Sequence, residues 1–242
     1  MESSNVVCHL TFDIDWAPDW SVVQLLDELD RYRARGTFFI THESDVVSEI
    51  ERRGHGIGIH PNFLPNSSQG GSPLEIVENL LKIAPNATAL RTHALHQSNP
   101  LLQQIFTEFV QLKYDFSILM YKFPHLGWFD WKFGGADFKR INYNWEDDWA
   151  FYDVNFDWSK FVPWSDRLIF DFHPIHLALN SSKEDLYNAL KAEIGKTPLF
   201  HVSKDVANRY RSDKAGAFSY LQSILSAPVR KLTFEDIKCG LE

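Results

Sequence analysis

The amino-acid sequence predicts an α/β protein whose core is a parallel β-sheet covered by helices, and three observations support this fold class. Apolar stretches typical of buried strands alternate with amphipathic helical segments along most of the chain. Helix-start and helix-stop residues separate these segments. Polar residues stand at the C-terminal ends of several predicted strands, the edge at which parallel sheets bind ligands. Periodicity alone leaves open whether the sheet closes into a barrel.

The first half of the chain contains three predicted strand–helix pairs. In the first helix, apolar residues recur at helical spacing. The third helix opens with Ser72-Pro73-Leu74-Glu75, a capping box with proline at the first helical position. The predicted strands cover residues 6–14, 37–41 and 56–60, and the helices cover residues 21–35, 44–53 and a segment that begins after Ser72.

The second half repeats the alternation, with one interruption. A long aromatic segment at about residues 120–164 breaks the rhythm, and a loop of this length inside a domain is usually functional. We therefore expect one domain over residues 1–242 with an aromatic insertion. The predicted strands cover residues 88–93, 114–119, 167–173 and, as a seventh strand, 231–234; the helices cover residues 99–112, 183–194 and 217–226.

Composition narrows the classes of function. The 242 residues are 44% hydrophobic, which fits one large domain, and the net charge of −8 argues against a nucleic-acid partner. Two cysteines are too few for a disulfide framework or a thiolate metal site. We expect no membrane span and, because residues 1–7 lack a secretory signal pattern, a cytoplasmic location. The aromatic content of 14% would suit a site that stacks on sugar rings.

Two carboxylates at the end of the first strand, Asp13 and Asp15, are the first candidates for a site. At positions i and i+2 of a strand they share a face, so they repel each other unless a cation or a proton lies between them. A metal would let one carboxylate act as a ligand and the other as a base. The alternative is that Asp15 merely caps a turn before Pro18.

Two further strand ends carry histidine or arginine. His60 follows a glycine-rich strand, and neutral imidazole is a common ligand of zinc and similar ions, although a buried structural histidine is the alternative. Arg91 could hold a catalytic carboxylate by hydrogen bonds, with an ordinary ion pair as an equal alternative. His93 could be a ligand or a substrate contact.

The strand that ends at Phe172-His173-Pro174 adds another pair of histidines. His173 suits a general acid that protonates a leaving amine, and His176 could bind metal or orient a substrate. Acids such as Asp147 and Asp148 often orient a histidine or an arginine, but a solvated acidic loop is the favoured interpretation for this pair. The other histidines are interpreted as structural: His9, His42, His55, His96, His125 and His201.

In this order the motifs resemble the polysaccharide deacetylase superfamily (NodB homology, carbohydrate esterase family four). Thr11-Phe12-Asp13-Ile14-Asp15 is similar to its first motif, and Phe172-His173-Pro174 to its last. Arg91-Thr92-His93 matches an Arg-x-Pro motif except that His93 replaces proline. The strings His-Pro-Asn-Phe-Leu, Arg-Thr-His and His-Pro-x-His look closest to the WbmS-like branch, which is associated with bacterial surface-polysaccharide gene clusters. Two further segments resemble the family's second strand and its approach to the first metal histidine: residues 36–39 and 54–61.

The resemblance implies a single distorted (β/α)7 barrel and a set of residue roles. It assigns Asp13 as general base, Arg91 as its tether and His173 as general acid, with Asp15 and His60 as metal ligands. The family's second metal histidine lies four residues after the first, where this chain has Leu64. Our hypothesis is that His93 supplies the third ligand, with His176 as second choice. Trp16, Asn62, His176 and Asp148 are expected to contact substrate or to support the catalytic groups.

The function implied is metal-dependent removal of an acetyl group, preferably N-acetyl, from a sugar in bacterial surface polysaccharide synthesis. Zinc is the first expectation for the divalent metal, with iron, manganese, cobalt and nickel as alternatives. The expected partner is an acetylated sugar or glycan precursor, linked to a nucleotide or a lipid if the protein is cytoplasmic. Two alternatives stay open: hydrolysis of a small amide, as in allantoinase-like relatives, and sugar binding without catalysis on a degraded metal site.

Overall fold

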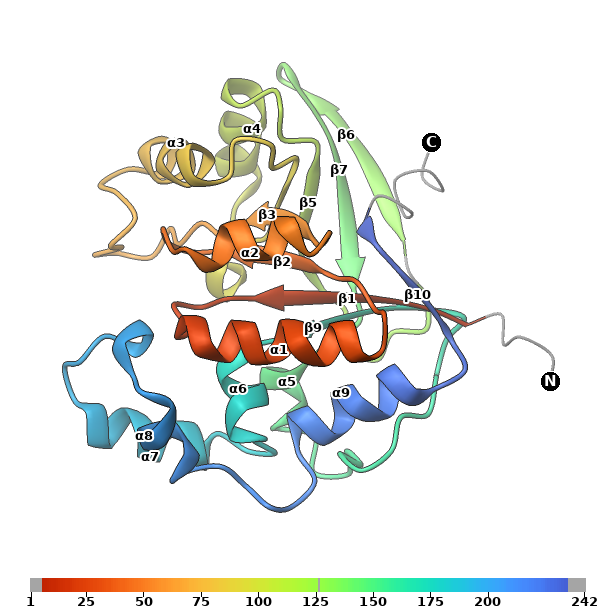
Figure 1. The fold of residues 1–242 in the computed structure, drawn as a ribbon. Coiled ribbons are helices and arrows are strands. Elements are labelled where there is room, and N and C mark those ends of the chain that lie inside the picture. Colours follow the sequence, from red (N-terminus) through yellow and green to blue (C-terminus); the bar gives the residue numbers. More distant parts are fainter. Residues whose placement is uncertain (1–5, 126, 235–242) are drawn as a thin grey trace.

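Strand β1 (Val7–Asp13) lies in the middle of the sheet in the computed structural model, which describes residues 6–125 and 127–234. It pairs in parallel with β2 (Thr37–Ile40) on one side and with β9 (Arg167–Phe172) on the other. Beyond β2 the parallel order continues through β3 (Gly56–Ile59), β4 (Ala89–Leu90) and β5 (Tyr114–Leu119) (Figure 1). The predicted α/β architecture with a largely parallel sheet is confirmed.

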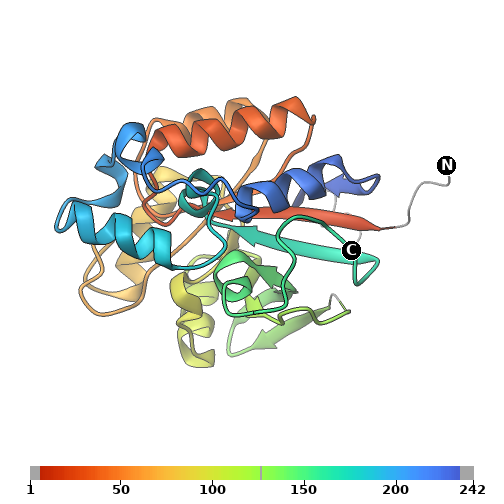
Figure 2. The same ribbon diagram turned by 90° about the horizontal axis from the view of Figure 1, so that it is seen from below.

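Helices cover the strands, and their sequence signals explain where they begin. In α1 (Asp19–Arg31) the apolar residues at helical spacing are buried against the sheet. Helix α3 (Pro73–Ile83) begins as the capping signal predicts, because the Ser72 side chain accepts a hydrogen bond from the Glu75 N–H. Figure 2 shows α1 and the segment around residues 120–150 on opposite sides of β1 and β9.

Four further helices match predicted ones with adjusted ends: α2 (Val46–Arg52), α4 (Asn99–Glu108), α7 (Asp185–Ile194) and α9 (Ala217–Ser226). The structure adds elements that were not predicted: α6 (Pro174–Leu179), α8 (Lys204–Asn208) and the 3₁₀ turns η1 (His93–Leu95) and η2 (Leu199–His201). No helix within residues 6–125 and 127–234 is both long enough and apolar enough to cross a bilayer.

The aromatic segment is not the loop that the sequence suggested. It contains β6 (Trp128–Phe133), β7 (Ala136–Tyr143), β8 (Trp145–Glu146) and the short helix α5 (Asp147–Ala150). Strands β6 and β7 form an antiparallel hairpin, and β7 pairs in parallel with β5. Strand β8 pairs in parallel with β9. The hairpin signal was present in the sequence but was not used: apolar and polar residues alternate from Phe129 to Lys139 around the two-residue turn Gly134-Gly135.

Asn144 lies where this segment changes partners. Only this residue separates β7, paired with β5, from β8, paired with β9. Its backbone N–H donates to Ile169 O, and its side-chain Oδ1 accepts from Ile169 N at 2.8 Å. The strands β1–β5, β7–β8 and β9 therefore follow one another around a distorted barrel whose sheet is not closed, because β7 and β9 are joined through Asn144 and not by a ladder among the described residues.

Replacing Asn144 with Ala should lower the free energy of unfolding by about 1–3 kcal/mol, because the buried Ile169 N–H would lose its acceptor. Urea denaturation followed by circular dichroism measures this difference at constant m-value. Asn188→Ala, in an exposed helical position, is the matched control and should change stability little. Equal stabilities of the Asn144→Ala and Asn188→Ala variants would contradict a structural role for the Asn144–Ile169 hydrogen bonds.

Two strand predictions need correction. The predicted seventh strand, residues 231–234, is the short β10 (Arg230–Leu232); among the described residues it pairs with the beginning of β1, off the main path of the sheet. The predicted strand over residues 88–93 ends at Leu90. Beyond it the Thr92 N–H donates to Ser117 Oγ and the His93 N–H to Pro61 O, so side-chain and loop partners replace the ladder.

Candidate active site

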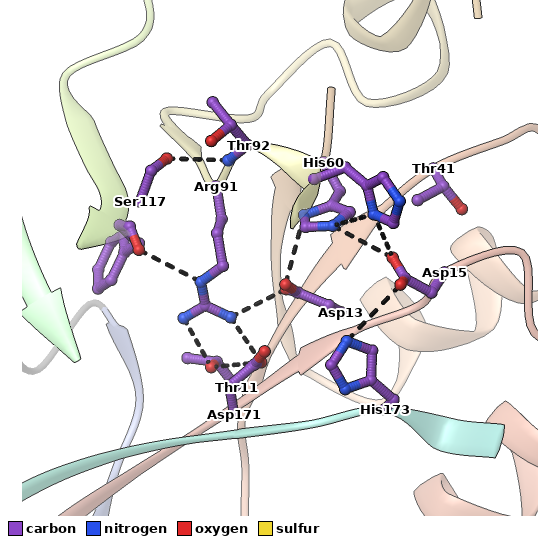
Figure 3. A network of polar contacts seen from close by, with 12 residues as sticks. Thr11, Asp13, Asp15, Thr41, His60, Arg91, Thr92, Ser117, Asp171 and His173 are labelled. Carbon is purple, nitrogen blue, oxygen red and sulfur yellow. Dashed lines mark hydrogen bonds and ion pairs between the residues drawn. The ribbon is translucent and has the colours of Figure 1, made fainter. Parts of the chain in front are cut away.

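The predicted site residues meet at the C-terminal ends of β1, β3, β4 and β9. Asp13, Asp15, His60, His93 and His173 line one cavity of about 110 Å³. Figure 3 shows Asp13, Asp15, His60 and His173 pointing toward one another. Parallel strands carry their carboxyl ends to the same rim, which explains why residues distant in sequence converge there. Arg91 lies beneath this cavity, fully buried.

Three of these side chains each bring one potential metal-ligating atom into a small cluster. Asp15 Oδ1 lies 3.1 Å from His60 Nε2 and 3.2 Å from His93 Nδ1, and the two ring nitrogens are 3.2 Å apart. Tetrahedral ligands at metal–ligand distances of 2.0–2.2 Å would be roughly 3.4 Å apart. Two imidazoles and a carboxylate are also a donor set that zinc and related ions accept. These residues therefore fit a divalent metal ion.

Unusual backbone conformations occur at or next to Asp15 and His93. Asp15 and Trp16 both adopt positive φ, at 45° and 54°, so the chain turns sharply as it leaves β1. Ala94 and Leu95, directly after His93, also have positive φ, both at 52°. Such conformations cost on the order of 1–3 kcal/mol for residues other than glycine and cluster at functional sites. The fold thus holds Asp15 and His93 in place against a local conformational cost.

Asp13 lies in a buried ion-pair network below the donor atoms. Arg91 Nη1 donates to Asp13 Oδ1 at 2.9 Å and lies 2.5 Å from Asp171 Oδ1. The guanidinium is held between the rings of Phe39 and Tyr143. Burial raises the pKa of Asp13 well above its usual range, although the charge of Arg91 acts in the opposite direction.

His173 has a buried carboxylate behind it. Its Nδ1 lies 2.6 Å from Asp147 Oδ1, and its backbone N–H donates to Asp147 Oδ2 at 2.9 Å. Its other ring nitrogen, Nε2, faces the donor group, 3.6 Å from Asp15 Oδ2. Burial lowers the pKa of His173, but the charges of Asp148, Asp147 and Asp15 outweigh it and hold this pKa well above its usual range. A protonated His173 can donate a proton into the cavity.

His176 is grouped with Asp148 and His173, whereas His93 is the residue grouped with Asp15 and His60, so the geometry favours His93 over His176 as the third ligand. Its Nε2 lies 2.8 Å from Asp148 Oδ1, and its ring packs against Phe151 and Tyr187. The interpretation of Asp147 and Asp148 as a solvated acidic loop is wrong for Asp147, which is fully buried. Asp148 lines the same cavity as Asp13 and His173.

Comparison with protein families matches residues 10–191 to the WbmS-like polysaccharide deacetylase model. The chain belongs to this polysaccharide deacetylase family. A crystal structure from Bordetella bronchiseptica, described as a polysaccharide deacetylase involved in O-antigen biosynthesis (WbmS), is 32% identical. The match covers 92% of this chain and 90% of that one, with a TM-score of 0.76. A search of curated proteins found no significant match.

Two structures of lower sequence identity also match. A family 4 acetyl xylan esterase from Clostridium thermocellum, solved with a cobalt ion, is 14% identical over 97% of this chain and 91% of that one, with a TM-score of 0.46. The peptidoglycan deacetylase PdaC from Bacillus subtilis, a D285S mutant, is 13% identical over 98% of this chain and 92% of that one, with a TM-score of 0.47.

Trp16 and Asn62, which were predicted to contact substrate or to support the catalytic groups, lie in different places. The Trp16 ring meets the His93 ring edge-on, with centroids 5.3 Å apart, so it borders the donor group. The described hydrogen bonds of Asn62 stay within its own loop, where its side chain accepts from Leu64 N and its N–H donates to Gln69. Leu64 is 36% exposed on that loop. In this deacetylase His93, and not the loop, brings a third donor atom.

Sequence reasoning gave no role to Asp171 and Thr11, which complete the Arg91 network. Thr11 Oγ1 accepts from Arg91 Nη2 and contacts Asp171 Oδ1, both at 2.9 Å. The available signal was an acid inside the apolar string Leu-Ile-Phe-Asp-Phe, because a carboxylate at a buried strand position is rarely left without a partner.

Proposed function

We propose that this polysaccharide deacetylase removes an N-acetyl group from a sugar during bacterial surface polysaccharide synthesis, with a divalent metal ion held by Asp15, His60 and His93. The observation that carries the proposal is the convergence of three metal-type donor atoms beside Asp13 and His173 in one cavity. Zinc is the preferred ion, since the donor set and spacing suit it; iron, manganese, cobalt and nickel accept the same donors.

The proposed reaction is the hydrolysis of an amide. A bound divalent ion would lower the pKa of water and polarise the acyl carbonyl. Asp13, held by Arg91, takes a proton from the water molecule while the oxygen of that water bonds to the acyl carbon. His173, oriented by Asp147, donates a proton to the nitrogen as the C–N bond breaks. The products are acetate and a free amino sugar.

The O-antigen role of the Bordetella relative supports a surface glycan precursor as substrate. We further propose that the protein acts in the cytoplasm, where such precursors are assembled. The alternative of sugar binding without catalysis was motivated by Leu64 at the position of the family's second histidine. The position of His93 argues against this alternative, because His93 Nδ1 lies 3.2 Å from both His60 Nε2 and Asp15 Oδ1 and can replace the missing histidine.

Metal analysis tests the proposed ligand set. Purified protein should hold about one divalent ion per chain, and His93→Ala or His60→Ala should lose most of it, since each removes a direct ligand. The affinity loss should exceed the roughly 10- to 100-fold that follows loss of an outer hydrogen-bond partner. Mass spectrometry measures the metal content of each protein. Acetate release before and after chelation measures how far activity depends on the metal.

Two histidine variants serve as controls for this experiment. His176→Ala and His96→Ala should keep the metal, because His176 bonds to Asp148 and His96 is exposed. Full metal content in both His60→Ala and His93→Ala would contradict the proposed site.

A further inference from the structure

Strand β6 forms one edge of the sheet. Among the described residues it pairs with β7 alone, and it stands at the end of the strand order, beyond β7 (Figure 1). Phe129 and Phe133 on this strand are 52% and 69% exposed. An edge strand that carries exposed aromatic side chains is a template on which a strand of another chain can pair. The edge of β6 is therefore a candidate interaction surface.

Every second residue of β6 turns its backbone polar groups away from β7. In an antiparallel pair, the residues that exchange hydrogen bonds with the partner strand alternate with residues that do not. The Asn142 N–H donates to Gly127 O at 3.2 Å, in register with the β6–β7 ladder, so the odd-numbered residues on the β6 side face β7. The N–H and C=O groups of Asp130 and Lys132 therefore lie on the outer edge.

The charges of Asp130 and Lys132 limit how two copies of this edge can pair. Two identical edges meet in antiparallel orientation about a two-fold axis. An axis at Asp130 or at Lys132 would place like charges opposite each other, which destabilises a sheet. An axis at Trp131 would place Asp130 opposite the partner's Lys132 and Lys132 opposite the partner's Asp130. Charge therefore favours the register centred on Trp131.

The hairpin extends this match of charges onto β7. Lys139 Nζ lies 2.8 Å from Asp130 Oδ1, and Lys132 Nζ lies 4.0 Å from Asp137 Oδ2. With the axis at Trp131, one row of side chains across the two copies would run Lys139, Asp130, the partner's Lys132 and the partner's Asp137. The two-fold axis repeats this row in the other direction. Each charge would thus lie next to charges of opposite sign.

The same register brings exposed aromatic rings together. Phe129 would lie opposite the partner's Phe133, and Trp131 opposite the partner's Trp131 on the axis. Alternate residues of a strand share a face, so these rings would form one apolar surface across both copies. Trp131 is already held by stacking on Phe138, with ring centroids 5.8 Å apart. Aromatic pairs are among the cross-strand pairs that stabilise sheets.

We propose that two copies of the chain associate through their β6 edges, paired antiparallel with the two-fold axis at Trp131, so that the sheet continues from one copy into the other. Charged residues on an edge strand usually prevent such pairing. Here Asp130 and Lys132 have opposite signs on the two sides of Trp131, so they permit this register and disfavour its neighbours. The inference is independent of the proposed deacetylation.

Charge reversal tests the proposed pairing. Wild-type protein should form a dimer whose population rises with concentration in sedimentation velocity experiments. Asp130→Lys and Lys132→Asp each place like charges opposite each other in the dimer and should weaken association by at least about tenfold. An equimolar mixture of the two variants should form a heterodimer, because each strand then meets one of opposite charge. Glu78→Lys and Lys82→Asp alter an exposed ion pair on α3 and, as matched controls, should dimerise like the wild type.

Amide hydrogen exchange provides a second measurement on the unaltered protein, should either β6 variant fail to fold. The amide protons of Asp130 and Lys132 should exchange slowly where the dimer forms and fast after dilution. The Trp131 amide, which the same alternation directs toward β7, should stay protected in both conditions. The assignment is overturned by a wild-type protein that stays monomeric, by a dimer that both variants leave intact, by a mixture that forms no heterodimer, or by fast exchange of Asp130 and Lys132 in the dimer.

Discussion

Replacing His173 with Ala should slow acetate release by roughly 10²- to 10⁴-fold, the usual contribution of a general acid or base. The effect should fall on kcat, because His173 is assigned to proton donation as the C–N bond breaks and not to binding of the sugar. Steady-state kinetics with a coupled acetate assay measures it. Metal content should stay close to that of the wild-type protein, since three other residues supply the proposed ligands.

A companion variant separates a catalytic role of His173 from a structural one. Asp147→Asn removes the carboxylate charge behind His173 Nδ1 and keeps nearly the same volume. We expect a smaller loss of kcat than in His173→Ala, because the imidazole remains but is less basic and less firmly oriented. His96→Ala, at an exposed position, controls for loss of a histidine. Undiminished turnover in His173→Ala would rule out its role as the acid.

Replacing Arg91 with Met should lower the free energy of unfolding by about 3–5 kcal/mol, because two buried carboxylates would lose their shared cation. Both Asp13 and Asp171 are buried and lie within 2.9 Å of Arg91 Nη1. Methionine fills most of the space between Phe39 and Tyr143, so the loss reports charge more than volume. Chemical denaturation monitored by tryptophan fluorescence measures it.

A second substitution tests the cause of that loss. Asp171→Asn added to Arg91→Met removes one of the two unpaired charges and should recover part of the stability. Arg52→Met removes an exposed arginine, 69% accessible, that pairs only at the surface with Glu49, and should change stability little. If Arg91→Met were as stable as Arg52→Met, the buried network would not have the energetic role assigned to it.

The order of motifs explains why so much of the site could be predicted from the sequence. Asp13, His60, Arg91 and His173 each follow an apolar strand, and parallel strands deliver such residues to one rim. The choice of His93 as third donor followed from a substitution at a motif position, and its Nδ1 does lie within 3.2 Å of Asp15 Oδ1. Its role as a metal ligand stays a prediction.

The aromatic segment was interpreted as a loop although part of it carries a local strand signal. Apolar and polar residues alternate from Phe129 to Lys139 around the two-residue turn Gly134-Gly135, a pattern typical of a β-hairpin. The parallel pairing of β7 with β5 has no such local signal. Asn144 gives no local sign that it joins two strands with different partners. Asp147 similarly looks like one of two acids in a polar turn, and only packing shows that it is the buried one.

The sequence by itself determined the α/β class, the strand ends that carry polar groups and the capped start of α3, because these depend on short-range periodicity and on neighbouring residues. Only the tertiary structure decided that β7 pairs with β5 while β8 pairs with β9, that Asp147 contacts His173, and that His176 contacts Asp148. Those outcomes depend on which distant segments share the limited space around β9, and contact energies between distant segments leave no periodic trace in the chain.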